Sequence, residues 1–154
     1  MRAGGAQARP ELVRALVELD RELLLRSAWL YDDALPFMRA LRSRGVKVAI
    51  VSDCSEHTRD LLESNGVADL ADALVLSCEV GAEKPAAEIF SHALDQLGVP
   101  ARRAVFVDDQ PSYCEGAAAL GIAAVQVVRG ELDGKVPAEG TAVVRSLSDV
   151  TAMF

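Results

Sequence analysis

The sequence has few cysteines and no long apolar run, and each shortage removes a class of protein. Its three cysteines, Cys54, Cys78 and Cys114, are widely spaced and form no C-x-x-C pair. Disulfide frameworks and zinc sites need paired or closely spaced cysteines, so we expect free thiols, buried or half-buried, in a reducing compartment. No apolar stretch approaches the roughly 20 residues of a membrane helix, and the opening MRAGGAQARP lacks the apolar core of a signal peptide. We therefore expect a cytoplasmic protein that does not bind or cross a membrane.

Positive charge is also scarce. The 154 residues contain 16 Lys and Arg against 23 Asp and Glu, which gives a formal net charge of −7. An acidic chain repels the phosphate backbone of nucleic acid, so we expect no nucleic-acid partner. A small phosphorylated substrate is still compatible with this charge, because it needs only one local positive centre. The length fits one domain with a substantial core.

From residue 46 onward, short apolar segments alternate with amphipathic ones. Strands are predicted over 46–53, 72–77, 103–109, 122–128 and, at an edge, 141–146. Helices are predicted over 10–28, 31–45, 55–66 (with Ser55 as a candidate N-cap), 84–98 (opened by Pro85) and 147–154, with an Ala-rich helix that ends at Gly121. Nearly all-apolar strands that alternate with helices are typical of a doubly wound, Rossmann-like α/β fold, with a parallel sheet covered on both faces. We expect a tail and a helix in residues 1–30 and the α/β core in residues 31–154.

Polar side chains stand where three of these strands end. Ser52 and Asp53 end the first strand, Lys84 follows the second, and Asp108 and Asp109 end the third. Ligands of open parallel sheets bind at this edge. A carboxylate pair suits Mg²⁺, while a lysine and a hydroxyl can hold phosphoryl oxygens, so together they indicate phosphoryl chemistry. Taken singly, each has a structural alternative: a turn or cap serine, an exposed lysine at a helix start, or an acidic turn.

The order of these motifs resembles the haloacid dehalogenase-like (HAD) hydrolase superfamily, whose members are mostly phosphatases. VKVAIVSD is similar to its second motif, EVGAEKP to its third, and VFVDDQPSYCEGAAALGI to its fourth. The resemblance covers residues 31–130 and implies Mg²⁺-dependent hydrolysis of a small phosphate monoester. It implies three sets of site residues: Ser52, Lys84 and Asp109 as catalytic, Ser52, Asp53 and Lys84 as phosphate-binding, and Asp108 and Asp109 as metal ligands.

The first motif of that superfamily, an apolar strand that ends in D-x-D, is absent from the sequence. Its first Asp is the nucleophile and its second is the acid/base. Asp20 lies within a helical pattern, and Asp32 and Asp33 lead into a helix, so neither place supplies the motif. In the superfamily this strand lies in the middle of the sheet, between the strands of the second and fourth motifs, so its absence leaves both strand edges unpaired. A milder departure is Tyr113, which stands where many members have a further Asp or Asn.

Three interpretations of the missing motif stay open from the sequence. The chain is a truncated C-terminal portion of a longer protein, with residues 1–30 as the remnant of a helical cap. Alternatively, it is a non-catalytic module that binds phosphate or a partner. In the third interpretation, a homodimer or a partner chain supplies the missing strand. For all three we expect the chain alone to hydrolyse phosphate esters poorly. The substrate is not identified, because the cap that sets specificity in this superfamily is largely absent.

Overall fold

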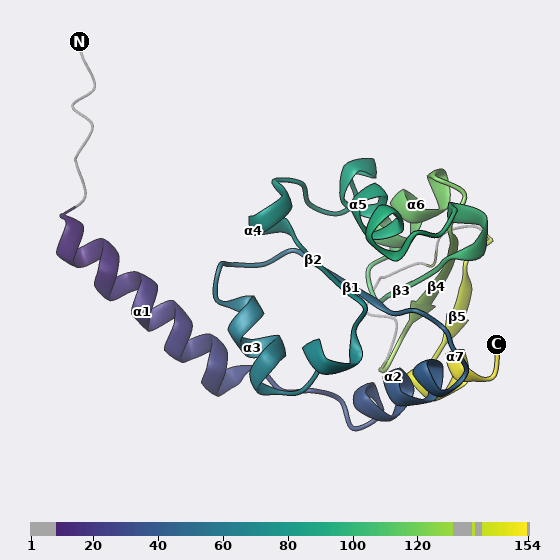
Figure 1. Ribbon diagram of the computed structural model, residues 1–154, viewed down its shortest axis with the longest axis horizontal. Coiled ribbons are helices and arrows are strands. Elements are labelled where there is room, and N and C mark those ends of the chain that lie inside the picture. The colour runs from purple at the N-terminus through teal and green to yellow at the C-terminus, as the bar shows by residue number, and fades with distance from the viewer. Residues whose placement is uncertain (1–8, 131–136, 138–139, 154) are drawn as a thin grey trace, which may run out of the picture. The chain divides into compact units, whose positions relative to one another are not determined.

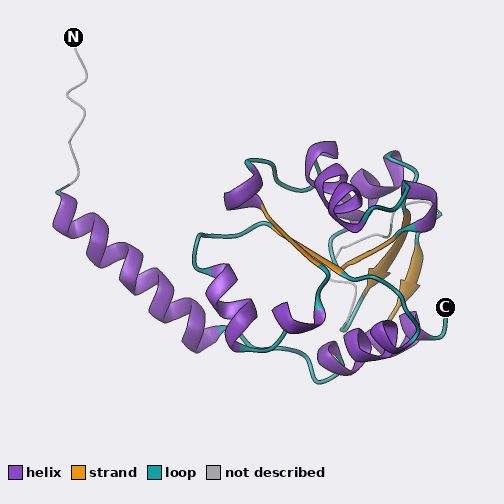
Figure 2. Cartoon of the chain, in the orientation of Figure 1, coloured by secondary structure: helices purple, strands orange, loops and turns teal. Residues whose placement is uncertain are grey.

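The computed structural model describes residues 9–130, 137 and 140–153, and Figures 1 and 2 show helices combined with parallel strands. The chain divides into two compact units, Met1–Leu30 and Tyr31–Phe154, and each is described by itself. The polar composition of residues 129–140 predicts a loop, and most of this segment lies outside the described residues. Among the described residues, no helix is long and apolar enough to cross a membrane.

The described part of the first unit contains one helix, α1 (Pro10–Ser27). Pro10 is at its first turn, where the missing backbone N–H needs no partner. Glu11 in the first turn and Arg26 in the last turn complement the helix dipole. No residue of α1 is buried, so its leucine stripe is exposed. The interpretation of residues 1–30 as a cap remnant stays a prediction.

The strands of the second unit form two parallel sheets. In one sheet, β1 (Ala49–Ser52) pairs with β2 (Ala73–Leu76). In the other, β4 (Ala123–Val127) pairs with both β3 (Val105–Asp108) and β5 (Ala142–Val144). No described strand joins β1 to β3, so each of these two strands has one edge without a strand partner. This break coincides with the place predicted above for the missing central strand.

Helices cover both faces of the strands, which confirms the predicted α/β class. Helix α5 contacts β1 and β2, and α6 contacts β3 and β4. Figure 1 shows α5 and α6 on one face, with α2 and α7 on the other. The helices and 3₁₀ turns of this unit are α2 (Ala34–Ser43), α3 (Thr58–Ser64), η1 (Ala68–Leu70), α4 (Ser77–Val80), α5 (Ala87–Leu97), η2 (Ala101–Arg103), α6 (Pro111–Ala119) and α7 (Leu147–Thr151).

One apolar cluster holds the two sheets together. Val75 from β2, Phe90 from α5 and Ala117 from α6 are buried in it, and Phe106 from β3 packs against it. The Phe90 and Phe106 rings meet edge to face, with their centroids 5.0 Å apart. Full burial of such a side chain stabilises a fold by about 1.5–3 kcal/mol. The sheets therefore share one core although their strands do not pair across the break.

Gly116 allows α6 to approach the segment that carries Lys84. A glycine within a helix costs about 1 kcal/mol relative to alanine, so its presence needs a reason. A Cβ atom at Gly116 would lie 2.6 Å from the Pro85 carbonyl oxygen, 2.7 Å from the Pro85 Cβ and 3.2 Å from the Phe90 ring. Only a residue without a side chain fits there, so Gly116 sets the distance between α6 and the Lys84–Pro85 segment.

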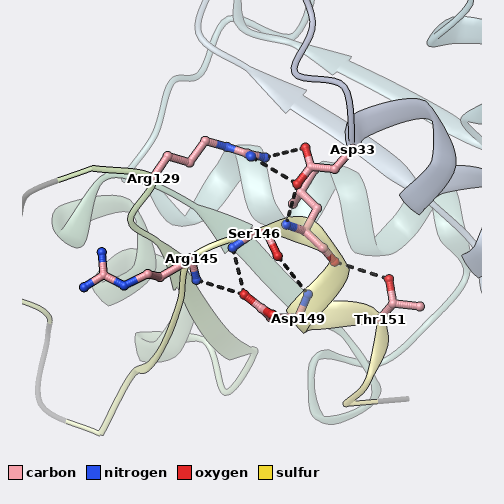
Figure 3. A network of polar contacts seen from close by, with 7 residues as sticks. Asp33, Arg129, Arg145, Ser146, Asp149 and Thr151 are labelled. Carbon is pink, nitrogen blue, oxygen red and sulfur yellow. Dashed lines mark hydrogen bonds and ion pairs between the residues drawn. The ribbon is translucent and has the colours of Figure 1, made fainter.

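A network of polar contacts joins the start of α2 to the end of the chain (Figure 3). Arg129 donates to both carboxylate oxygens of Asp33, at 3.0 and 2.8 Å, and the Leu147 N–H donates to the same carboxylate at 2.9 Å. The hydrogen bonds from Arg129 are the main reason that the pKa of Asp33 lies below its usual value. Ser146 and Asp149 form a capping box at α7. These contacts hold α2 and α7 beside the sheet.

Three local predictions are wrong. Helix α3 begins at Thr58 after His57, so Ser55 is not its N-cap; the loop around Ser55 is held against α4 instead, because Cys78 Sγ donates to the Ser55 carbonyl at 3.4 Å. Helix α5 begins at Ala87 rather than at Lys84–Pro85, because the Lys84 N–H is bonded to Asp53 at 2.9 Å. Cys78, which we expected to be at least half-buried, is exposed, because it lies on the one-turn helix α4 just beyond β2.

Candidate functional site

The five predicted site residues lie at the carboxyl ends of β1 and β3 and in the loop after α4. Ser52 ends β1 and is followed by Asp53, Asp108 ends β3 and is followed by Asp109, and Lys84 lies between α4 and α5. Hydrogen bonds join Asp53, Lys84 and Asp108. Among the described residues, no hydrogen bond links the Ser52 hydroxyl to the other four. The topology thus places all five on one side of the unit, and three of them are in direct contact.

Lys84 is the centre of this arrangement. Its Nζ lies 2.9 Å from Asp108 Oδ2, and its backbone N–H donates to Asp53 Oδ1 at 2.9 Å. The side chains of Lys84 and Asp108 are only 9% and 13% exposed. Water therefore screens this ion pair weakly, and loss of either partner would leave a poorly solvated charge. Lys84 connects the end of β1 to the end of β3 across the break between the sheets.

The two adjacent aspartates have separate partners, which answers how their like charges are accommodated. Asp108 Oδ1 accepts a hydrogen bond from the Gln110 N–H at 2.9 Å, in addition to the ion pair with Lys84. Asp109 Oδ2 accepts from Gln110 Nε2 at 3.2 Å, and the Asp109 carbonyl accepts from Gln126 Nε2 at 3.2 Å. Gln126 is fully buried, and its Oε1 has no hydrogen-bond partner among the described residues. One cation and several amide donors therefore stabilise the pair.

The sequence analysis did not assign Tyr113 or Gln126 to the site. Lys84 Nζ lies 4.5 Å from the centroid of the Tyr113 ring, within the range of a cation–π contact. The Tyr113 hydroxyl hydrogen-bonds to Asp53, and this bond is the main reason that the pKa of Tyr113 is raised. The raised pKa favours the neutral phenol, which can donate to this carboxylate. Tyr113 could have been identified from its position in the first turn of the helix that follows Asp109. The apolar sequence of β4 gave no such signal for Gln126.

The loop after β1 is held against α4. The Cys54 N–H donates to Ser77 Oγ at 2.9 Å. Arg59 of α3 donates to both carboxylate oxygens of Glu79, each at 2.7 Å. These hydrogen bonds are the main reason that the pKa of Glu79 is lowered. The position of Asp53 relative to Lys84 is therefore supported by contacts on both sides of the loop.

The acidic pair fits Mg²⁺ by its donor atoms. Mg²⁺ prefers oxygen ligands and keeps several waters, so it needs only one or two protein carboxylates besides substrate oxygens. Asp108 and Asp109 supply two such carboxylates. Among the described residues there is no group of three or more His, Cys, Asp or Glu that could hold a metal ion. The described residues therefore fit a metal ion that is bound by two carboxylates together with water and substrate oxygens, and they do not form a site made of protein ligands alone.

Comparison with known proteins assigns this arrangement to a family. Residues 3–121 match the family model of haloacid dehalogenase-like hydrolases. The structure resembles the crystal structure of a HAD phosphatase from Thermococcus onnurineus with a TM-score of 0.78 and 28% identity, covering 94% of this chain and 69% of that one.

Two similar proteins carry phosphatase names. The chain is 34% identical over 154 residues to Phosphatase MT3486 of Mycobacterium tuberculosis, covering 97% of this chain and 64% of the relative. It is 36% identical over 131 residues to a phosphoserine phosphatase of Thermus thermophilus, covering 83% of this chain and 51% of the relative. The chain thus spans between 51% and 64% of the length of these two proteins.

Proposed function

The chain belongs to the haloacid dehalogenase-like hydrolase family, and from this premise we propose that it serves the Mg²⁺-dependent hydrolysis of a small phosphate monoester in the cytoplasm. The observation that carries the proposal is the position of Lys84 Nζ, which is 2.9 Å from Asp108 and only weakly exposed. A cation held rigidly in a shielded site stabilises phosphoryl oxygens better than one in water. The phosphatase names of the two relatives described above support the same substrate class.

Each site residue has a distinct role in this proposal. Lys84 and the Ser52 hydroxyl bind phosphoryl oxygens, and Asp53 orients Lys84 by accepting its backbone N–H. Asp108 and Asp109 would hold Mg²⁺, which when bound neutralises charge on the phosphoryl group. Asp109 is catalytic through that role. Tyr113 keeps Lys84 in place through its ring and keeps Asp53 in place through its hydroxyl.

The nucleophile has to come from outside the described residues. The sequence has no D-x-D after a strand, and no described strand lies between β1 and β3. We propose that a further strand, from elsewhere in the same protein or from a partner chain, pairs with both edges. A second copy of the chain could supply a strand for these edges but no D-x-D, whereas a different chain could supply both the strand and the motif. The chain alone should therefore hydrolyse esters slowly, because loss of a covalent nucleophile costs on the order of 10⁴–10⁶ in kcat.

Turnover and ligand binding test this proposal together. Without a partner, p-nitrophenyl phosphate with Mg²⁺ should be hydrolysed near the background rate. Inorganic phosphate with Mg²⁺ should still raise the thermal midpoint of the chain. Lys84→Met should abolish that rise, measured against the variant's own ligand-free midpoint. Lys47→Met is the matched control, because its amine donates to the Leu97 carbonyl at an exposed site. Rapid turnover that Asp109→Asn abolishes would contradict the absence of a nucleophile.

A second candidate function is non-catalytic binding, which is favoured by the edges of β1 and β3 that pair with no described strand. A module of this kind uses the same lysine and acidic pair to bind a phosphorylated ligand and uses the edges to bind a partner. It predicts stabilisation by phosphate and Mg²⁺ with no turnover, even when the partner is present. Co-purification of the partner followed by the p-nitrophenyl phosphate assay separates the two functions.

A further inference from the structure

Two of the three cysteines lie side by side next to the candidate site. Cys54 is the second residue after β1, and Cys78 is the second residue after β2. The two strands pair in parallel, with Ser52 opposite Leu76. Each cysteine lies two residues beyond its member of this pair. Neighbouring strands lie about 4.8 Å apart, which brings such positions close together. The Sγ atoms are 3.9 Å apart.

Contacts on both sides keep the two thiols together without a covalent bond. The Cys54 N–H donates to Ser77 Oγ at 2.9 Å, and Cys78 Sγ donates to the Ser55 carbonyl at 3.4 Å. The ion pair between Arg59 and Glu79 holds α3 against α4 on the same side of the loop. Cys78 is exposed and Cys54 is half-buried. A reagent in solution can therefore reach the pair through Cys78.

We propose that Cys54 and Cys78 form a reversible dithiol–disulfide site whose co-substrate is a small disulfide such as oxidised glutathione. The Cys78 thiolate attacks one sulfur of the reagent, the S–S bond of the reagent breaks, and one small thiol leaves with the electron pair and takes up a proton. The Cys54 thiolate then attacks the Cys78 sulfur of the mixed disulfide and displaces the second small thiol. Two protein thiols are oxidised to one disulfide while one reagent disulfide is reduced to two thiols.

The geometry requires little rearrangement for this step. A disulfide has an S–S distance of about 2.05 Å and joins residues whose Cα atoms are about 4.4–6.8 Å apart, a range that includes the spacing of neighbouring strands. Rotation of the Cys54 and Cys78 side chains about their χ1 bonds can bring the sulfurs together. Cys114 cannot take part, because it lies on α6 and its side chain is fully buried. The site depends on the sheet register and stands independently of the proposed function.

Intact-mass spectrometry of the full chain incubated with oxidised glutathione tests this site. The expected product has lost two hydrogens, its proteolytic map links Cys54 to Cys78, and Cys114 is the one thiol left to alkylate after unfolding. The Cys54→Ser variant should stop at a mixed disulfide on Cys78 and gain one glutathione in mass. The Cys114→Ser variant should form the intramolecular disulfide as the wild type does. A wild-type chain that retains three alkylatable thiols, that accumulates only the mixed disulfide, or that links Cys114 overturns the proposal.

Redox titration in glutathione buffers supplies a second test that does not use variants. Because the fold holds the two thiols together, the equilibrium constant for their oxidation should exceed that of the urea-unfolded chain by at least about tenfold. Equal constants in the folded and unfolded chains would show that the fold does not favour the disulfide, and would overturn the proposal.

Discussion

Replacing Lys84 by Met removes the cation between the two sheets while keeping the length of the side chain. In the wild type, Lys84 Nζ lies 2.9 Å from Asp108 Oδ2, and both side chains are largely shielded from water. The variant leaves the Asp108 carboxylate next to Asp109 without its cation. We therefore expect the free energy of unfolding of the second unit to fall. The cause would be the uncompensated charge of Asp108 rather than lost packing.

The size of the effect follows from the burial of the pair. Removing one partner of a buried ion pair costs about 3–5 kcal/mol. Asp108 keeps its hydrogen bond from the Gln110 N–H and is not completely buried, so the lower end, about 3 kcal/mol, is expected. For a unit of about 120 residues, an unfolding entropy of about 2.1 cal/mol/K per residue converts this loss to a midpoint lower by about 12 °C.

Urea unfolding of the single and double variants measures this prediction. The double variant Lys84→Met with Asp108→Asn should regain about 2 kcal/mol relative to Lys84→Met alone, because the uncompensated charge is gone. The Lys47→Met control should stay within about 0.5 kcal/mol of the wild type, because Lys47 is an exposed residue. The reasoning would be refuted if the free energy of unfolding of Lys84→Met lay within about 1 kcal/mol of the wild type and the effects of the two single substitutions added up in the double variant.

Three further predictions concern packing, acid stability and thiol reactivity. Gly116→Ala should cost about 1–3 kcal/mol in urea unfolding because its Cβ would overlap the neighbouring proline. Gly130→Ala should be almost neutral, because no atom of the described residues lies within 4 Å of the added Cβ. Hydrogen bonding from Arg129 lowers the pKa of Asp33, so the ionised Asp33 stabilises the fold above about pH 4, and this stabilisation is lost as the pH falls through the lowered pKa. Asp33→Asn should therefore make the free energy of unfolding less dependent on pH on the acid side. An unchanged slope would contradict this role. Burial raises the pKa of Cys114 to about 11, so iodoacetamide should alkylate Cys54 and Cys78 first in the folded chain, and equal rates for all three would count against its burial.

The strands and most helices could be predicted from local patterns. Apolar runs such as VKVAIV and AVFV favour buried parallel strands whatever the rest of the chain does, and Gly98 ends α5 with a positive φ of 64° that favours glycine. The proximity of Lys84 to Asp53 and Asp108 could also be expected, because the carboxyl ends of parallel strands share one edge. The grouping of the candidate site residues was therefore predictable as far as the topology alone determines it.

Features that depend on contacts between distant segments could not be predicted. Ser55 has the residue type of an N-cap, but its loop is held by α4, and helix α3 begins later. Gln126 lies in the middle of an apolar strand, and its hydrogen bond to the Asp109 carbonyl exists only because β3 and β4 are neighbours. Tyr113 was set aside as a lost acidic position, although its ring lies beside the Lys84 ammonium group.

The break between β1 and β3 also affects how the chain behaves at high concentration. An unbroken sheet has two border strands, but the described strands provide four: β2 and β5 on the outside and β1 and β3 at the break. In a parallel strand, successive amides point to opposite sides, so every second N–H along β1 and β3 is directed away from its one strand neighbour. These amides should exchange with deuterium quickly while the alternate amides are protected. These outward-directed groups are a template for extended segments of other chains, so self-association rather than unfolding should limit the usable concentration of this protein.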